Sequence, residues 1–222
     1  MRITRCLVLG LALAALAAPV AAQTAFDDTP ALSIRPFGVG TLESFTAVDT
    51  FKAVFGRSYE PFLGGGVQIV VQDQYFVELT ASRFERTGQR AFISGGKTFQ
   101  LGIPLKTTIT PFEVTGGYRF RVSPRIRPYA AAGVGLYWYK EESDFADQTA
   151  APPARGVDLD TRHAGFVVNG GVEFRAHRWI GVSADVQYTH VTGILGTAGV
   201  SQQAGENDLG GVAGRVKLIV GR

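Results

Sequence analysis

The stretch HRWIGVSADVQYTH, residues 177–190, decides the class of fold. From Ile180 onward every second residue is apolar or aromatic, up to Val186 and Tyr188, and the residues between them, such as Asp185, are small or polar. A period of two indicates a β-strand with one apolar face and one polar face. The stretch therefore raises the question of which face meets the surroundings, and whether those surroundings are water or lipid.

Seven further segments alternate in the same way, so the sequence predicts eight strands in all. Their predicted ranges are 31–43, 61–72, 75–86, 105–121, 126–139, 164–175, 179–190 and 208–221. Most reach the roughly nine to eleven residues that a tilted strand needs to cross a bilayer. Short links alternate with long links, which fall at 44–60, 87–104, 140–163 and 191–207. Short turns at one end and long loops at the other are typical of transmembrane barrels, whose turns face the periplasm.

The apolar faces carry aromatic residues near both ends and aliphatic residues between them. We expect one girdle near the turns and another near the loops, formed respectively by Tyr75, Tyr118, Phe120, Phe174 and Trp179, and by Trp138, Phe166 and Tyr188. Two aromatic girdles around an aliphatic belt match the two interfaces of a bilayer. We therefore predict that the apolar face is turned outward to lipid. A soluble periplasmic lipocalin-like barrel, with its faces reversed, is an alternative.

The polar face predicts a network of charged side chains inside the barrel, which comprises Arg35, Glu78, Arg119, Glu173, Asp185, Arg215 and Lys217. Counting residues from the turns pairs Glu78 with Arg119, and Asp185 with Arg215, on neighbouring strands. Buried charges must be paired, because an isolated one is costly to remove from water. Eight strands enclose an interior that side chains can fill. We therefore expect the network to close the lumen to ions.

The first residues have the pattern of an export signal. A short basic start precedes an apolar run, and the small residues Val20-Ala21-Ala22 follow it, which predicts a cleaved signal peptide at 1–22. We then expect a short periplasmic segment at 23–30 and a single barrel domain at 31–222. The only cysteine, Cys6, lies in the signal, so no disulfide is expected.

The charge balance argues against nucleic acid as a partner. The chain of 222 residues has a formal net charge of +3, and removal of Arg2 and Arg5 with the signal leaves +1, from 20 basic and 19 acidic residues. Binding to nucleic acid requires a concentrated basic surface. The composition gives no indication of one.

On this architecture the chain resembles the eight-stranded outer-membrane barrels of Gram-negative bacteria of the OmpA, OmpX and OmpW type. The resemblance implies an all-β, eight-stranded antiparallel up-and-down transmembrane β-barrel, surrounded by outer-membrane lipids including lipopolysaccharide and inserted by the barrel assembly machinery. It also implies a structural, adhesive or surface-interaction role, without enzymatic activity, cofactor or metal ion. Such barrels commonly end in an aromatic residue, whereas this chain ends Ile219-Val220-Gly221-Arg222.

Two other functions stay open on the sequence. A conduit or binding site for small apolar molecules, as in OmpW-like barrels, needs an apolar pocket beneath the loops or a gap between strands. A lipid A-modifying enzyme needs a base, a nucleophile and an orienting carboxylate close together near the outer leaflet. The best candidate set is His190 with Thr189, Thr192 or Ser201. We expect His190 to be only a polar residue of the interface.

Two of the long links carry patterns of their own. In TAVDTFKAVFG, 46–56, apolar residues recur at helical spacing, with Thr46 placed to cap the start and Gly56 the end. This helix either covers the barrel mouth or lies at the membrane interface, and we expect it to cover the mouth. The third link is rich in acidic residues without a calcium-loop spacing, so we expect a solvated loop there: Glu141, Glu142, Asp144, Asp147, Asp158 and Asp160.

Overall fold

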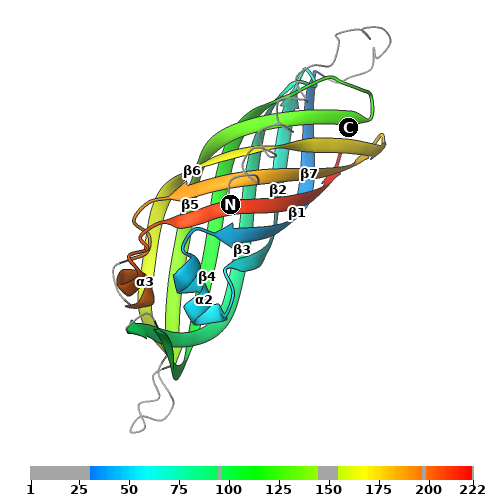
Figure 1. Cartoon of the computed structure of the whole chain (residues 1–222). Helices are drawn as coiled ribbons and strands as arrows, with labels where there is room; N and C mark the ends of the chain where they lie inside the picture. The colour runs from blue at the N-terminus through cyan, green and yellow to red at the C-terminus, as the bar shows by residue number, and fades with distance from the viewer. Residues whose placement is uncertain (1–30, 95–96, 145–154, 197–198, 222) are drawn as a thin grey trace, which may run out of the picture.

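The computed structural model describes residues 31–94, 97–144, 155–196 and 199–221, which form a closed antiparallel barrel of eight strands (Figure 1). Each strand pairs with its neighbours in the chain, and the first pairs with the last. The strands are β1 (Leu32–Phe45), β2 (Tyr59–Val71), β3 (Tyr75–Ser94), β4 (Lys97–Arg119), β5 (Ile126–Asp144), β6 (Arg155–His177), β7 (Ile180–Val191) and β8 (Leu209–Val220). The predicted fold class is confirmed, whereas the predicted signal peptide and the segment 23–30 lie outside the described residues.

Closure of the sheet leaves the central part of the barrel without an open edge. The ladder between β1 and β8 runs from Phe37 opposite Ile219 to Phe45 opposite Gly211. In hydrocarbon every backbone N–H and C=O group must find a partner within the protein, and a closed barrel supplies one for each. The pairing therefore suits a strand that crosses a bilayer.

Two of the predicted long links are largely strand. The structure extends β3 to Ser94 and begins β4 at Lys97, so most of the link predicted at 87–104 is a protruding hairpin. Similarly, β5 runs on to Asp144 and β6 begins at Arg155. The prediction was wrong here because these extensions lie beyond the belt of outward apolar residues. Both of their faces are polar or mixed there, so the alternation that marks a strand is lost.

The outward face of the barrel is apolar and the inward face is charged. Large apolar side chains stay exposed all around the exterior, among them Val134, Val186 and Val216. Arg35 and Lys217, in contrast, are each only 1% exposed inside the barrel. A soluble barrel has the reverse arrangement. The lipocalin-like alternative is therefore wrong.

The end of the barrel with the long links also carries two short helices. These are α2 (Val48–Phe55) and α3 (Gly199–Ala204), which lie together at the end opposite the C-terminus (Figure 1). The predicted helix is thus present, and it ends at Gly56, whose left-handed backbone has φ 78° and whose N–H donates to Lys52 O. No helix within the described ranges has the length and apolar character needed to cross a membrane.

Candidate functional site: a charged lumen beneath an apolar cap

The lumen near the short turns holds a cluster of arginines around Glu173. Arg35 Nη1 and Nη2 donate to Glu173 Oε1 at 2.9 Å and Oε2 at 2.7 Å, which is a two-pronged pairing of planar groups. Arg119 Nη2 donates to the same Oε2 at 2.8 Å. All three side chains are almost completely buried. One carboxylate thus joins β1, β4 and β6 across the interior.

A tight turn between β2 and β3 supplies the second carboxylate of this cluster. Gln72 and Asp73 both have left-handed backbones, with φ of 51° and 57°. This conformation costs roughly 1–2 kcal/mol for a residue other than glycine. It turns the buried Asp73 side chain into the barrel, where its carboxylate pairs with Arg119 at 3.3 Å and with Arg127. The contacts with the arginines offset the strain of the turn.

A second cluster lies further toward the loops and centres on Lys217. Lys217 Nζ lies 2.6 Å from Glu78 Oε1 and 3.5 Å from Asp185 Oδ2. Arg215 Nε in turn lies 2.5 Å from Asp185 Oδ1. Lys217 Nζ also lies 5.2 Å above the ring of Phe37, within range of a cation–π interaction. The lysine therefore connects four strands.

The structure corrects one predicted pairing inside the lumen. Asp185 and Arg215 lie opposite each other on β7 and β8 and form the expected ion pair. Glu78 instead lies opposite Thr115, and Tyr75 lies opposite Tyr118, so Arg119 is four residues further toward the turns than predicted. The predicted strand continued to residue 121, whereas β4 ends at Arg119. The count therefore placed Arg119 too far from the turn. Glu78 therefore pairs with Lys217, and Arg119 with Glu173 and Asp73.

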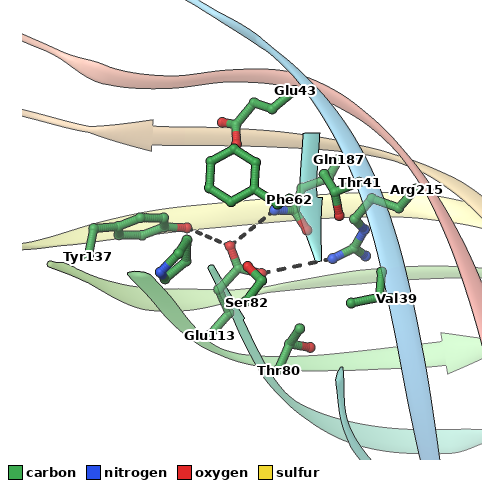
Figure 2. A pocket seen from close by; sticks show the side chains of 11 residues that line it. Val39, Thr41, Glu43, Phe62, Thr80, Ser82, Glu113, Tyr137, Gln187 and Arg215 are labelled. Atoms are coloured by element: carbon green, nitrogen blue, oxygen red, sulfur yellow. Dashed lines mark hydrogen bonds and ion pairs between the residues drawn. The ribbon is translucent and has the colours of Figure 1, made fainter. Parts of the chain in front are cut away.

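Glu113 continues the polar network toward the mouth of the barrel (Figure 2). Its Oε1 accepts hydrogen bonds from Tyr137 Oη at 2.7 Å and from Gln187 Nε2 at 3.0 Å, and Arg215 Nη1 lies 3.8 Å from Oε2. These groups border a cavity of about 20 Å³ that Glu43 also lines. That volume holds about one water molecule and excludes a larger ligand.

An apolar cluster fills the barrel mouth above the polar network. Its buried members come from all eight strands, from α2 and its N-cap, and from the link after β7. They are Phe45, Ala47, Phe51, Phe62, Phe84, Ile109, Tyr137, Tyr139, Val167, Val191, Ile194, Leu195 and Leu209. We call this cluster the apolar cap. Phe51 of α2 stacks on Phe45 with ring centroids 3.8 Å apart and is 1% exposed. The helix therefore covers the mouth and does not lie at the membrane interface.

The link after β7 also holds α2 in place from outside. Glu206 accepts hydrogen bonds from the backbone N–H groups of Asp49 at 3.0 Å and Thr50 at 2.8 Å. These N–H groups have no partner within the helix, and a carboxylate satisfies them. Thr46, the predicted cap, instead donates its hydroxyl to Gly210 O. The sequence could not reveal this cap, because Glu206 is about 160 residues away in the chain.

The residues of the two predicted girdles lie on the outer surface. Tyr75, Phe120 and Trp179 are exposed near the turns, and Tyr118 lies between the first two, with ring centroids 5.3 Å from Tyr75 and 5.1 Å from Phe120. Phe174 is exposed as well. At the other end, Phe166 packs against Tyr188 with centroids 5.9 Å apart, and Arg162 lies over the ring of Trp138.

The candidate catalytic set around His190 is not assembled. The ring of His190 packs on the outward-facing Phe166 at 5.5 Å, whereas the neighbouring Thr189 is buried inside the barrel. Adjacent residues of a strand point to opposite faces, so this base cannot reach this nucleophile. Ser201 Oγ accepts a hydrogen bond from Gly196 N in the external link, and Thr192 is exposed.

The acidic third link yields no metal site in the described part of the chain, where no group of three potential metal-ligating side chains lies together. Glu141 accepts a hydrogen bond from Tyr139, and Glu142 pairs with Lys140 at 2.8 Å. Asp147 lies outside the described residues. Glu141 and Glu142 thus pair with neighbours along their own strand.

Sequence reasoning missed several members of the polar network. Tyr129, whose hydroxyl donates to Asp185 Oδ2 at 2.5 Å, and Tyr137 lie on the inward parity of β5, and the alternation could have identified them. Glu113 likewise lies on the inward parity of β4, but the predicted network did not include it. Asp73 carried no signal, because an acidic residue in a turn normally faces solvent.

Comparisons with known proteins agree with this architecture. A family model described as the outer membrane protein beta-barrel domain matches residues 8–214. None of the curated proteins compared with the chain matches it significantly.

Three solved structures resemble the chain at low sequence identity. Ail of Yersinia pestis in complex with a heparin analogue, sucrose octasulfate, is 11% identical with a TM-score of 0.48, covering 87% of this chain and 98% of Ail. Neisserial surface protein A is 12% identical with a TM-score of 0.48, over 86% of this chain and 96% of that chain. OprG from Pseudomonas aeruginosa is 14% identical with a TM-score of 0.47, over 86% and 94%. Because the family model spans nearly the whole sequence, the chain belongs to the outer membrane protein beta-barrel domain family and is an integral protein of the outer membrane.

Proposed function

We propose that the protein is a closed, non-conducting barrel that acts through its external surface, as a structural or surface-interaction protein of the envelope. The observation that supports this proposal is the packing of side chains inside the barrel at two levels. The ion pairs of Arg35, Glu173 and Arg119 fill it near the turns, and the apolar cap fills the mouth. An ion entering from either end would have to displace paired charges or a packed apolar cluster.

Solute flux into proteoliposomes tests this proposal. Liposomes containing the refolded protein, placed in an isotonic arabinose solution, should swell no faster than protein-free liposomes. A general porin in the same lipid provides the positive control. Swelling that rises in proportion to the amount of this protein would contradict the proposal.

The hairpin of β3 and β4 is the part of the external surface best suited to meet a partner. Phe92 and Phe99 stack at 5.1 Å and remain 36% and 45% exposed, and Leu101 beside them is 50% exposed. Exposed apolar groups that lie together mark interaction surfaces. The hairpin also extends well beyond the belt of outward apolar residues, which leaves it accessible outside the membrane.

Adherence of whole cells tests the role of this hairpin. Cells that carry the protein should adhere to cultured epithelial cells or to polystyrene more strongly than cells without it. The double variant F92S/F99S should lower the adherence, whereas Gln100→Ser, a change of an exposed polar residue on the same hairpin, should not. Equal adherence with and without the protein would contradict an adhesive role.

Lipopolysaccharide is the lipid partner that we propose for the external girdle. Arg162 is exposed and lies over the ring of Trp138 in the external girdle. Aromatic girdles lie at the headgroup level of a membrane, so this guanidinium would be within reach of lipid A phosphates. We further propose that the barrel assembly machinery inserts the chain. A lipid-exchange assay with purified lipopolysaccharide should show weaker retention by Arg162→Gln; unchanged retention would contradict the first of these proposals.

The two alternative functions receive less support. A conduit for small apolar molecules requires space beneath the loops, but Phe51, Ile194 and Leu195 fill it. A lipid A-modifying enzyme requires a catalytic set, but His190 and Thr189 lie on opposite faces of β7. We propose that the protein has no enzymatic activity. Mass spectrometry of lipid A from cells with and without the protein should show identical acyl chains, and a difference would restore the enzymatic alternative.

A further inference from the structure

The end of the barrel with the short turns exposes only positive charge among its described residues. Arg121 and Arg125 belong to the turn between β4 and β5, and Arg178 belongs to the turn between β6 and β7. All three are exposed, as is His177 beside Arg178. Arg121 Nη2 also donates to Gln72 O at 2.5 Å, so the positive charge reaches the third turn. We call these three arginines the arginine rim.

The carboxylates that the structure describes near this end do not neutralise the rim, because they face the lumen. Asp73 and Glu173 are buried, and their ion pairs are with Arg35, Arg119, Arg127 and Arg175. Four arginines thus surround two carboxylates, and this buried cluster itself has an excess of positive charge. The rim therefore adds to the positive potential beneath it.

The external end of the barrel is different. Its exposed cations alternate with carboxylates on the same surface, as where Arg83 and Lys106 both pair with Glu85 at 2.5 Å and 2.7 Å. Lys140 pairs with Glu142 in the same way. Among the described residues, the rim therefore differs from the external end in that none of its three arginines has a carboxylate partner on the surface.

The rim also lies at the level of the girdle next to it. Arg121 follows Phe120 and Arg178 precedes Trp179, and these two aromatic residues are 42% and 48% exposed on the outer surface. Aromatic girdles sit at the headgroup level of a membrane. The guanidinium groups one residue away are therefore within reach of lipid phosphates at that level.

We propose that the arginine rim binds the phosphate groups of anionic phospholipids in the inner leaflet of the outer membrane. A guanidinium presents two parallel N–H groups that match two phosphate oxygens. Because the rim lies at the level of the girdle, a lipid is favoured over a periplasmic polymer such as peptidoglycan. Side chains that bind the carboxylates of peptidoglycan would project away from the membrane. The rim would thereby fix the depth of the barrel and collect anionic lipid around its inner end. This inference rests on the place of the barrel in the membrane and does not depend on a closed lumen.

The two tryptophans of the chain provide the test, because one lies at each end of the barrel. Trp138→Phe leaves Trp179 beside the rim as the only tryptophan, and Trp179→Phe leaves Trp138 in the external girdle as a matched control. Each protein is refolded into vesicles of phosphatidylglycerol and phosphatidylcholine in equal amounts, in which one lipid or the other carries brominated acyl chains. The quenching of each tryptophan then reports which lipid contacts it.

We expect Trp179 to show a two- to fivefold preference for phosphatidylglycerol at low salt, since each arginine near the surface attracts anionic lipid by roughly this factor. The preference should fall toward one in about 1 M NaCl, which screens charges beyond about 3 Å. Trp138 should show no preference. Heat-modifiable migration on gels verifies that each variant has folded.

Substitution of the rim arginines tests whether they cause the lipid preference. In the Trp138→Phe background, R125Q/R178Q should lower the preference at Trp179 by at least about half. The control R83Q/K97Q removes two exposed cations at the other end and should leave it unchanged. Equal quenching of Trp179 by both lipids, or a preference that survives R125Q/R178Q, would overturn the proposal. If Trp179 shows no lipid preference, and the protein sediments with purified peptidoglycan only when the rim arginines are present, the rim binds the cell wall instead.

Discussion

At the scale of single residues, alternation along the strands predicted which side chains enter the lumen but not which partners they meet. Glu78 and Arg119 both face inward, yet each pairs with a residue from a distant strand. Long side chains cross the narrow interior, so their partners depend on the stagger of the strands around the barrel. A sequence read strand by strand does not contain that stagger.

Glu173→Ala should strongly destabilise the barrel. The substitution leaves Arg35 without its two-pronged partner and Arg119 with only Asp73, in a site with almost no exposure to water. Removal of one partner of a buried ion pair costs roughly 3–5 kcal/mol. Urea unfolding in detergent or lipid vesicles, followed by heat-modifiable migration, measures the change.

Glu85→Ala is the matched control, because Glu85 pairs with Arg83 and Lys106 on the exposed outer surface. Exposed pairs contribute about 0–1 kcal/mol. Equal losses of stability in the two variants would show that the lumen is filled with water and that its charges are screened.

At the scale of elements, the strands and the helix over the mouth were predictable, and their extensions and anchors were not. The stripe of apolar residues at 46–56 predicted α2. A helix that packs one face on a buried surface carries such a stripe in its sequence. Ile194 and Leu195, which complete the apolar cap, are two apolar residues among glycine and threonine and have no period. The turn at Gln72 and Asp73 was predicted as a link, but its left-handed backbone was not, since such positions normally carry glycine or asparagine.

Two substitutions in this turn should have opposite effects. Gln72→Gly relieves a left-handed backbone and should stabilise the folded barrel by about 0.5–1 kcal/mol, after the greater freedom of glycine in the unfolded chain is deducted. Asp73→Gly relieves the same strain but removes the carboxylate that pairs with Arg119 and Arg127, and it should destabilise the barrel. Urea unfolding distinguishes the two. A stabilising Asp73→Gly would mean that the carboxylate contributes nothing.

Phe51→Ala should loosen the apolar cap. The ring is 1% exposed and stacks on Phe45, and truncation of a buried phenylalanine costs roughly 3–5 kcal/mol. We expect α2 to become accessible to protease added to intact cells, while the barrel itself stays folded. Phe99→Ala on the exposed hairpin is the control and should leave cleavage at α2 unchanged. Protection of α2 in both variants would contradict its role as part of a packed cap.

At the scale of the whole molecule, the fold is a barrel with its apolar surface outside and its charges inside. Alternation, two girdles and the order of short and long links were sufficient to predict this arrangement, because a bilayer imposes all three. The sequence also predicted that charges close the lumen, but the side chains that could do so together were visible only in the structure. The closure that we propose rests on arginines that share carboxylates across the interior near the turns, and on aromatic side chains of β1, α2 and β2 at the mouth.

Planar-bilayer recording of the purified wild-type protein measures whether the lumen is closed. We expect a baseline without steady channels, because the charge network and the apolar cap obstruct the path in series. The double variant Phe51→Ala/Glu173→Ala, if it folds, should open brief conducting events by weakening both levels. Steady, large conductance from the wild-type protein would show that the lumen is open.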